Sequence, residues 1–145
     1  MRFGTDGIRG RANTELTPSN ALDLGRAAAR VLGAPLAVVG GDSRLSTPML
    51  EAALVAGLSS EGVEVHRLGL APTPAVAFEA ARLGAMGVVV SASHNLYHDN
   101  GIKLFAPGGT KLPDDVETRI EAALAELDGP AARDGHETDP AASGP

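Results

Sequence analysis

The sequence lacks cysteine and tryptophan, and aromatic residues make up only 3% of its 145 residues. Without cysteine the chain has no disulfide framework, no thiolate metal site and no thiol nucleophile, which fits a reducing compartment. We therefore expect a cytoplasmic protein. Because aromatics are so few, alanine, leucine and valine must fill most of the core. Such a core predicts helices and strands that approach one another closely.

Positive charge and long apolar runs are also scarce. The chain has 12 Lys and Arg against 18 Asp and Glu, a formal net charge of −6, whereas a nucleic-acid-binding domain is normally basic. No apolar run reaches the roughly 18 residues that suggest a membrane span, and the N-terminus has no apolar signal-peptide core. The sequence thus predicts a soluble protein whose partners are neither nucleic acids nor membranes.

What is present is a succession of helix and strand patterns. Apolar residues at helical spacing, with capping residues at the boundaries, predict helices over 18–32, from 47 towards 62, over 75–83 and over 114–127. Short apolar or alternating runs predict strands over 36–39, 63–68, 88–90 and 102–105. The pair Asn100-Gly101 is a strong tight-turn signal. Together these patterns predict an α/β fold of three layers, α/β/α, with a mixed, mostly parallel sheet and an Asn-Gly hairpin that adds an antiparallel pair.

The last residues differ in composition from the rest. From Gly129 to Pro145 the chain consists largely of proline, glycine, alanine and charged residues without apolar periodicity. This composition is typical of a linker or a disordered segment. We therefore expect one folded domain over residues 1–128, followed by a linker or disordered tail over 129–145.

Three loops are expected at the carboxyl ends of strands, where open α/β sheets bind ligands; they begin at Gly40, Gly69 and Ser91. The third is the richest in functional groups, which are the hydroxyl of Ser93, the imidazole of His94, the amides of Asn95 and Asn100, the carboxylate of Asp99 and, on the next strand, the amine of Lys103. A turn capped by Ser, Asn and Asp side chains is the alternative explanation. Near the N-terminus, Arg9 and Arg11 among glycines suit either an anion site or a turn with solvated arginines.

Other chemistries of the third loop are less favoured. His94 and His98 are four residues apart, as in a metal-binding helix with Asp99 as a third ligand, but Asn100-Gly101 directly after them favours a turn. Ser93 and His94 are sequence neighbours, which seldom orient as nucleophile and base, and no Gly-x-Ser-x-Gly elbow is present. There is also no phosphate-binding P-loop motif. A histidine metal site, a serine hydrolase and a P-loop nucleotidase are therefore all disfavoured.

Several ordered motifs carry a resemblance to a known family. They are FGTDGIRG at 3–10, LTP at 16–18, GDSRLS at 41–46, PTP at 72–74 and SASHNLYHDNGIK at 91–103. Together they resemble domain I of the α-D-phosphohexomutases, and most closely the bacterial phosphoglucosamine mutases, from Met1 to about Leu127. The resemblance implies an isomerase that interconverts glucosamine 6-phosphate and glucosamine 1-phosphate through a phosphoserine and a bisphosphate intermediate.

The resemblance also implies roles for individual residues. Ser93 matches the serine that carries the transferable phosphoryl group, whose phosphate is in turn a ligand of Mg²⁺. The implied catalytic residues are Ser93, His94, Arg9 and Lys103, and the implied phosphate- or substrate-binding residues are Asn95, Arg9, Lys103 and Thr5. Arg9 and Lys103 would neutralise phosphoryl groups near the serine, because a phosphoserine adds about −1.5 to −2 charge at neutral pH.

The chain departs from the family pattern in two residues and in length. Leu96 stands where proline is usual, and Gly41 stands where arginine is common. Family members have four domains, and the metal loop, the sugar loop and the phosphate loop of domains II to IV are absent from this sequence. The implied partners are therefore a phosphosugar and the remaining domains of the same chain, which would supply the other Mg²⁺ ligands, and these residues alone should lack turnover. The alternatives are a phosphoglucomutase or phosphomannomutase domain, or a non-catalytic phosphosugar-binding module.

Overall fold

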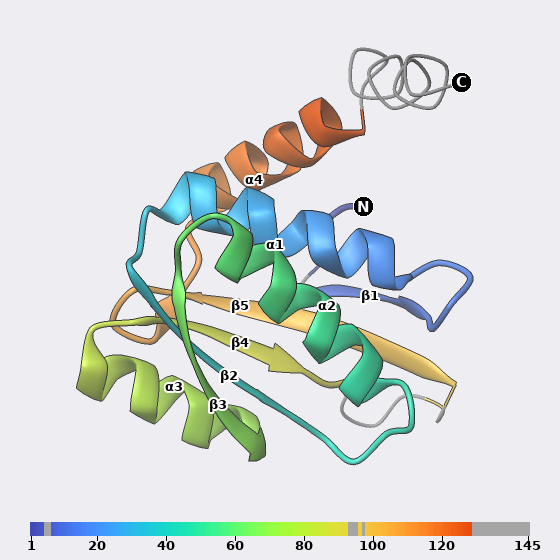
Figure 1. Cartoon of the computed structure of the whole chain (residues 1–145), viewed down its shortest axis with the longest axis horizontal. Helices are drawn as coiled ribbons and strands as arrows, with labels where there is room; N and C mark the ends of the chain where they lie inside the picture. Colours follow the sequence, from blue (N-terminus) through green and yellow to red (C-terminus); the bar gives the residue numbers. More distant parts are fainter. Residues whose placement is uncertain (5–6, 93–95, 97, 129–145) are drawn as a thin grey trace, which may run out of the picture.

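The computed structural model describes residues 1–4, 7–92, 96 and 98–128, and in this part of the chain helices cover both faces of one sheet (Figure 1). The elements are β1 (Ile8–Arg11), α1 (Pro18–Leu32), β2 (Leu36–Gly41), α2 (Thr47–Ser60), β3 (Glu64–Leu70), α3 (Thr73–Leu83), β4 (Met86–Val90), β5 (Asp99–Ala106), β6 (Thr110–Lys111) and α4 (Asp114–Leu127). The expected α/β class is confirmed. The expected linker over 129–145 lies outside the described residues.

The sheet is mixed, as expected. Its strand order is β1-β5-β4-β2-β3, with β6 also paired to β5. Strand β2 runs parallel to both β3 and β4, whereas β5 runs antiparallel to β4, β1 and β6. The parallel share is therefore smaller than the sequence predicts. The reason is that β1 and β6, two short strands without an apolar run, both pair with the edge of β5.

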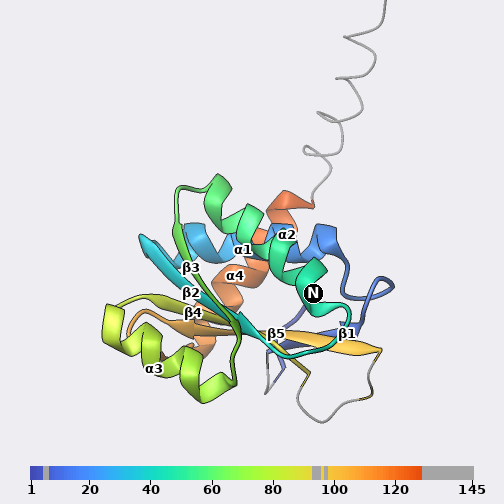
Figure 2. The ribbon, with the colours of Figure 1, turned by 60° about the horizontal axis from the view of Figure 1, so that its bottom comes forward.

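Helices α1, α2 and α4 lie on one face of the sheet and α3 lies on the other (Figures 1 and 2). Because successive strand residues point to opposite faces, Val88 and Val90 join the core beneath α1 and α2, whereas Val89 packs with Val76 of α3. All three valines are buried. The three-layer arrangement predicted from these apolar runs is confirmed.

Helix boundaries follow local chemistry closely. The hydroxyl of Thr17 accepts a hydrogen bond from the backbone N–H of Asn20, and the Asn20 side chain accepts one from the Thr17 N–H, which forms a capping box at the start of α1. Gly33 and Gly84 end α1 and α3 with φ values of 62° and 64°, the left-handed region that favours glycine. Helix α3 begins at Thr73, two residues earlier than expected.

The tight turn predicted at Asn100-Gly101 is wrong. Both residues lie inside β5, where they pair with Gly10 and Arg9 of β1. The chain turns earlier, where the Asp99 N–H donates to the carbonyl of Leu96 at 2.9 Å. Gly101 is needed for close packing instead, since a Cβ there would lie 2.9 Å from the Arg9 side chain and 2.9 Å from the Ser91 carbonyl.

Helices α1 and α2 approach one another as closely as an alanine-rich core predicts. A Cβ at Gly25 of α1 would lie 2.5 Å from the Leu54 carbonyl, and a Cβ at Gly57 of α2 would collide with the Leu22 carbonyl. These two glycines let the helix backbones touch. Of the helices that the structure describes, none is long and apolar enough to cross a membrane.

Candidate phosphoryl-transfer site

The loops that follow β2, β3 and β4 meet at one edge of the sheet. The Asp42 N–H donates to the Val90 carbonyl at 3.1 Å, and the Ala71 N–H donates to the Gly41 carbonyl at 3.0 Å. A pocket at this edge is lined by residues from the last part of these strands and from the segments that follow them, which are Gly41, Asp42, Ser43, Leu70, Ala71, Pro72, Thr73, Val89 and Ser91. The expected convergence of three loops at the carboxyl ends of the parallel strands is therefore confirmed.

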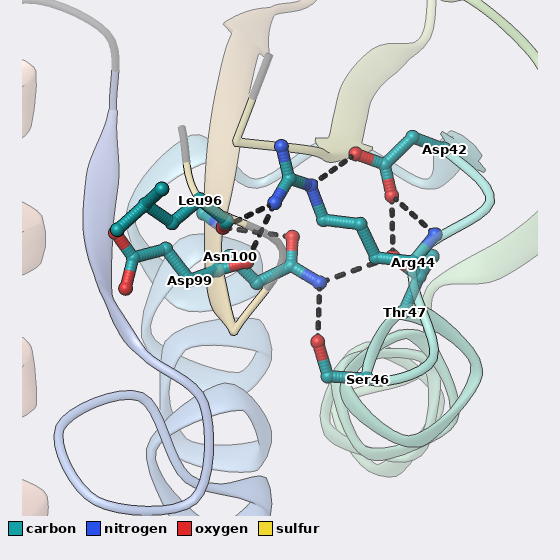
Figure 3. A network of polar contacts seen from close by, with 8 residues as sticks. Asp42, Arg44, Ser46, Thr47, Leu96, Asp99 and Asn100 are labelled. Atoms are coloured by element: carbon teal, nitrogen blue, oxygen red, sulfur yellow. Dashed lines mark hydrogen bonds and ion pairs between the residues drawn. The ribbon is translucent and has the colours of Figure 1, made fainter. Parts of the chain in front are cut away.

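Asp42, the first residue after β2, is the centre of a polar network (Figure 3). Its carboxylate accepts hydrogen bonds from the Thr47 hydroxyl at 2.6 Å, from the Arg44 backbone N–H at 3.1 Å and from Arg44 Nε at 3.0 Å. Burial raises the pKa of Asp42, but these bonds and one from the Ser91 side chain outweigh it and hold the pKa below its ordinary value. Asp42 therefore stays ionised at neutral pH.

Arg44 connects this network to the chain just before β5. Its Nη1 donates to the carbonyl oxygen of Leu96 at 2.5 Å and to that of Asp99 at 3.2 Å. The Arg44 side chain is only 12% exposed. A single guanidinium thus joins the loop after β2 to the two sides of the turn at 96–99.

Asn100, on β5, also contacts this network. It is fully buried, and its amide donates to the Ser46 hydroxyl at 2.8 Å and to the Thr47 hydroxyl at 3.0 Å. Its own oxygen accepts the Gly101 N–H at 2.8 Å. We call the set Asp42, Arg44, Ser46, Thr47 and Asn100 the Asp42 network.

The sequence assigned no function to the Asp42 network. Asp42, Arg44 and Ser46 fall in the stretch 41–46, which served only to support the family resemblance, and Thr47 served only as the expected start of a helix. The amide of Asn100 was named among the functional groups of the third loop, but its Asn-Gly context indicated a turn. The signal that could have found the network is an Asp-x-Arg triplet directly after a buried strand, at the edge where ligands bind.

Arg9 and Lys103 lie on one face of the sheet. Ile8 pairs with Ile102, and both belong to the core beneath α1 and α2. The alternation of side chains therefore puts Arg9 and Lys103 on the opposite face. The Lys103 ammonium lies 5.4 Å from the centroid of the Phe105 ring, within range of a cation–π interaction. The structure thus places Arg9 and Lys103, two of the residues expected to bind phosphoryl groups, on the same face of the sheet.

Four nominated residues, Thr5, Ser93, His94 and Asn95, lie outside the described residues. Their immediate neighbours are described: Ala92 is buried at the end of β4, and the Ser91 N–H donates to the Gly101 carbonyl at 2.9 Å. On the other side of 93–95, the described chain resumes at Leu96, whose carbonyl Arg44 contacts.

The two departures from the family pattern have structural explanations. A Cβ at Gly41 would lie 2.7 Å from the Thr47 side chain and 3.0 Å from the Val90 carbonyl, so glycine fits this network where a larger residue would not. Leu96 takes part through its carbonyl, which proline also has, while its side chain is 66% exposed. The Arg44 contact to residue 96 is therefore compatible with either residue.

The described residues alone do not form a metal site. Among them, no three His, Asp or Glu side chains gather closely enough to hold an ion. Asp42 already accepts hydrogen bonds from Arg44 and Thr47. Mg²⁺ prefers near-octahedral oxygen coordination, and this part of the chain does not supply it.

Comparisons with known proteins agree with this geometry. Residues 1–130 match the family described as phosphoglucomutase/phosphomannomutase, alpha/beta/alpha domain I. The chain is 55% identical over 141 residues to a protein named phosphoglucosamine mutase from Corynebacterium aurimucosum, a match that covers 90% of this chain and 32% of the relative. It is 60% identical over 129 residues to one from Salinispora arenicola, which covers 84% and 29%.

Solved structures give the same fold. A putative phosphomannomutase from Thermus thermophilus superposes with a TM-score of 0.79 at 33% identity, covering 86% of this chain and 30% of that one. A phosphoglucomutase/phosphomannomutase family protein from Burkholderia thailandensis gives 0.76 at 32% identity, covering 87% and 30%. The chain thus spans about 30% of the length of the relatives it matches.

Proposed function

The chain belongs to the phosphoglucomutase/phosphomannomutase family, and we propose that it is domain I of a phosphoglucosamine mutase. The observation that carries the proposal is the identity of 55% and 60%, over most of this chain, to relatives that bear this name. The proposed substrate pair is glucosamine 6-phosphate and glucosamine 1-phosphate. Solved relatives with phosphomannomutase titles reach only 33% identity, which makes the phosphomannomutase or phosphoglucomutase reaction the second candidate.

Ser93 is the proposed carrier of the phosphoryl group. In the proposed cycle, a substrate hydroxyl attacks the phosphorus of phosphoserine 93, the bond from phosphorus to the serine oxygen breaks, and a bisphosphosugar forms. The bisphosphosugar then returns its other phosphoryl group to Ser93 and leaves as the product. Each step transfers one phosphoryl group between two oxygens, so the serine ends as it began.

Phosphoryl transfer asks the protein mainly for positioning and for charge stabilisation. Arg9 and Lys103 are the proposed sources of charge, a role that their shared face of the sheet supports. His94 and Asn95 are proposed to shape the phosphoryl site, and Thr5 to bind substrate. These three assignments rest on the motif resemblance alone.

Magnesium and further domains complete the proposal. The described residues do not gather a metal site, so we propose that Mg²⁺ is held by the phosphate of Ser93 together with ligands from the remaining domains of the same polypeptide. Intact-mass analysis of the protein isolated from its source tests this part. A chain about three times as long, with one phosphoryl group on Ser93, is expected. A protein of this length with an unmodified Ser93 would favour the non-catalytic phosphosugar-binding module.

The substitution Ser93→Ala in the complete protein tests the reaction. It should abolish both phosphoryl incorporation and turnover of glucosamine 6-phosphate, because no other hydroxyl is proposed to carry the group. Ser43→Ala is the matched control, since Ser43 is an exposed serine in the loop after β2. Turnover that survives Ser93→Ala would contradict the proposal, and faster turnover of glucose or mannose phosphates by the unaltered protein would favour the second candidate.

A further inference from the structure

Arg44 holds the chain on the C-terminal side of the serine segment by its main chain. Its Nη1 donates to the carbonyl oxygens of Leu96 and Asp99, which are residues 3 and 6 positions after Ser93. Both bonds reach backbone atoms, so the contact fixes the path of the chain whatever side chain stands at 96.

Asp42 holds Arg44 in place and also reaches the N-terminal side of the segment. The carboxylate accepts Arg44 Nε at 3.0 Å, and it accepts a hydrogen bond from the side chain of Ser91. Thr47, at the start of α2, donates to the same carboxylate at 2.6 Å and so anchors it to a helix. The Asp42 and Arg44 pair therefore contacts the chain on both sides of residues 93–95.

The hydrogen bonds made by residue 44 require an arginine side chain. Nε and Nη1 belong to one rigid planar group, so a guanidinium that pairs with Asp42 through Nε has the direction of its Nη1 donor fixed at the same time. A lysine ammonium is a single charged centre on a flexible stem and cannot impose that direction. Figure 3 shows the guanidinium between the Asp42 carboxylate and the carbonyls of the 96–99 turn.

We propose that Arg44 is a positioning residue for phosphoryl transfer: held by Asp42, it fixes the carbonyls of Leu96 and Asp99 and thereby the backbone that presents Ser93. This inference rests on the proposed function. It assigns Arg44 no contact with substrate. A displacement of about 1 Å in a reacting group can cost roughly 100-fold in rate, so loosening this backbone should lower kcat.

The test compares Arg44→Ala and Arg44→Lys with the control Arg30→Ala in the complete protein. Arg30 is a suitable control because it also forms an arginine–carboxylate pair, with Glu61 at 2.8 Å, far from the loops at this edge of the sheet. Both Arg44 variants should lower kcat by about 10- to 100-fold and leave KM within about twofold. Arg30→Ala should change neither constant.

Two further readouts separate positioning from general loss of stability. Amide hydrogen exchange in the peptide that covers residues 91–98 should be faster in both Arg44 variants and unchanged in Arg30→Ala. Added guanidinium ion at millimolar concentration should restore part of the kcat of Arg44→Ala, because it can replace the missing group. If Arg44→Ala does not fold, Arg44→Lys alone decides the kcat and exchange measurements.

The outcomes are distinguishable from failure of the proposed function. A kcat within twofold of the unaltered protein in Arg44→Lys, or a loss that guanidinium does not restore in a folded Arg44→Ala, would overturn the positioning role. If the unaltered complete protein does not interconvert the two sugar phosphates, the proposed function fails. The hydrogen-exchange measurement remains informative in that case. Unchanged amide exchange over 91–98 in the Arg44 variants would then reject Arg44 as the residue that fixes this backbone.

Discussion

The substitution Asn100→Asp tests whether Asn100 is buried, as in the structure, or lies in a tight turn, as its sequence indicates. In a tight turn, Asp-Gly and Asn-Gly are both favoured. A turn residue would therefore tolerate Asn100→Asp with a change in the free energy of unfolding of no more than about 0.5 kcal/mol. The structure predicts a much larger effect of the same substitution.

The magnitude follows from the hydrogen bonds of the side chain. The amide of Asn100 donates to the hydroxyls of Ser46 and Thr47 at 2.8 and 3.0 Å, and a carboxylate cannot donate. Thr47 cannot compensate, because it already donates its hydroxyl proton to Asp42 at 2.6 Å, whereas the Ser46 hydroxyl can rotate to donate to a carboxylate. The lost Thr47 hydrogen bond costs about 1 kcal/mol, and a buried carboxylate without a cationic partner costs several more. We expect a loss of at least about 3 kcal/mol at pH 7 from these contributions together.

Urea unfolding of this chain at pH 7, followed by circular dichroism, measures the effect. Asn13→Asp is the matched control, because Asn13 is exposed and has a φ of 70°, a conformation that asparagine and aspartate both tolerate. The control should stay within about 0.5 kcal/mol of the unaltered chain. A loss below about 1 kcal/mol for Asn100→Asp, indistinguishable from the control, would refute the buried network.

Two other predictions concern the same fold. Gly57→Ala should destabilise the chain by about 1–3 kcal/mol in urea unfolding, because the clash with the Leu22 carbonyl outweighs the roughly 1 kcal/mol by which alanine favours a helix; a stabilised variant would show that α1 and α2 do not touch at this point. The pKa of Asp42 lies below its ordinary value of 3.8, so its contribution to stability is complete above that value and is lost as the pH falls through the lower, folded-state pKa. Asp42→Asn should therefore flatten the fall in unfolding free energy below about pH 4, and an unchanged slope would contradict the assignment.

Local signals predicted the elements that local interactions determine. The start of α1 was predicted from Thr17 and Pro18, because a capping hydroxyl and a proline act within one helical turn. The apolar runs likewise predicted β2 and β4, although β2 ends two residues later than predicted and β4 begins two residues earlier. Strand β1 was missed because its four residues contain one apolar side chain, Ile8. What makes it a strand is its pairing with β5, ninety residues away in the sequence.

In the site, too, local interactions could be predicted from the sequence and non-local ones could not. The three loops at the sheet edge could be predicted, because parallel strands place their carboxyl ends together. The contact between Arg44 and Leu96 could not, since it joins residues 52 positions apart. The local preference of Asn100-Gly101 for a turn was real, but burial of the Asn100 amide among the Ser46 and Thr47 hydroxyls overrides it. Local sequence reasoning fails here because the interacting groups come from different loops.

We propose that the cations near the site have two different roles. Arg44 pairs with the Asp42 carboxylate at 3.0 Å, so its positive charge is balanced within the protein and is poorly suited to neutralise a phosphoryl group. We propose that this task falls to Arg9 and Lys103, on the other face of β1 and β5 from the α1 core. The Lys103 ammonium lies over Phe105, which is buried, while Lys103 itself is partly buried. Leaving this cation–π contact therefore costs between the roughly 0.5–1 kcal/mol of an exposed contact and the about 2 kcal/mol of a desolvated one. A dianionic phosphoserine repays that cost, since charge-assisted hydrogen bonds to charged groups are worth about 1.5–3 kcal/mol. In our proposal, two such hydrogen bonds outweigh the cation–π contact, so the Lys103 side chain moves when the phosphoryl group is present while Arg44 remains paired with Asp42.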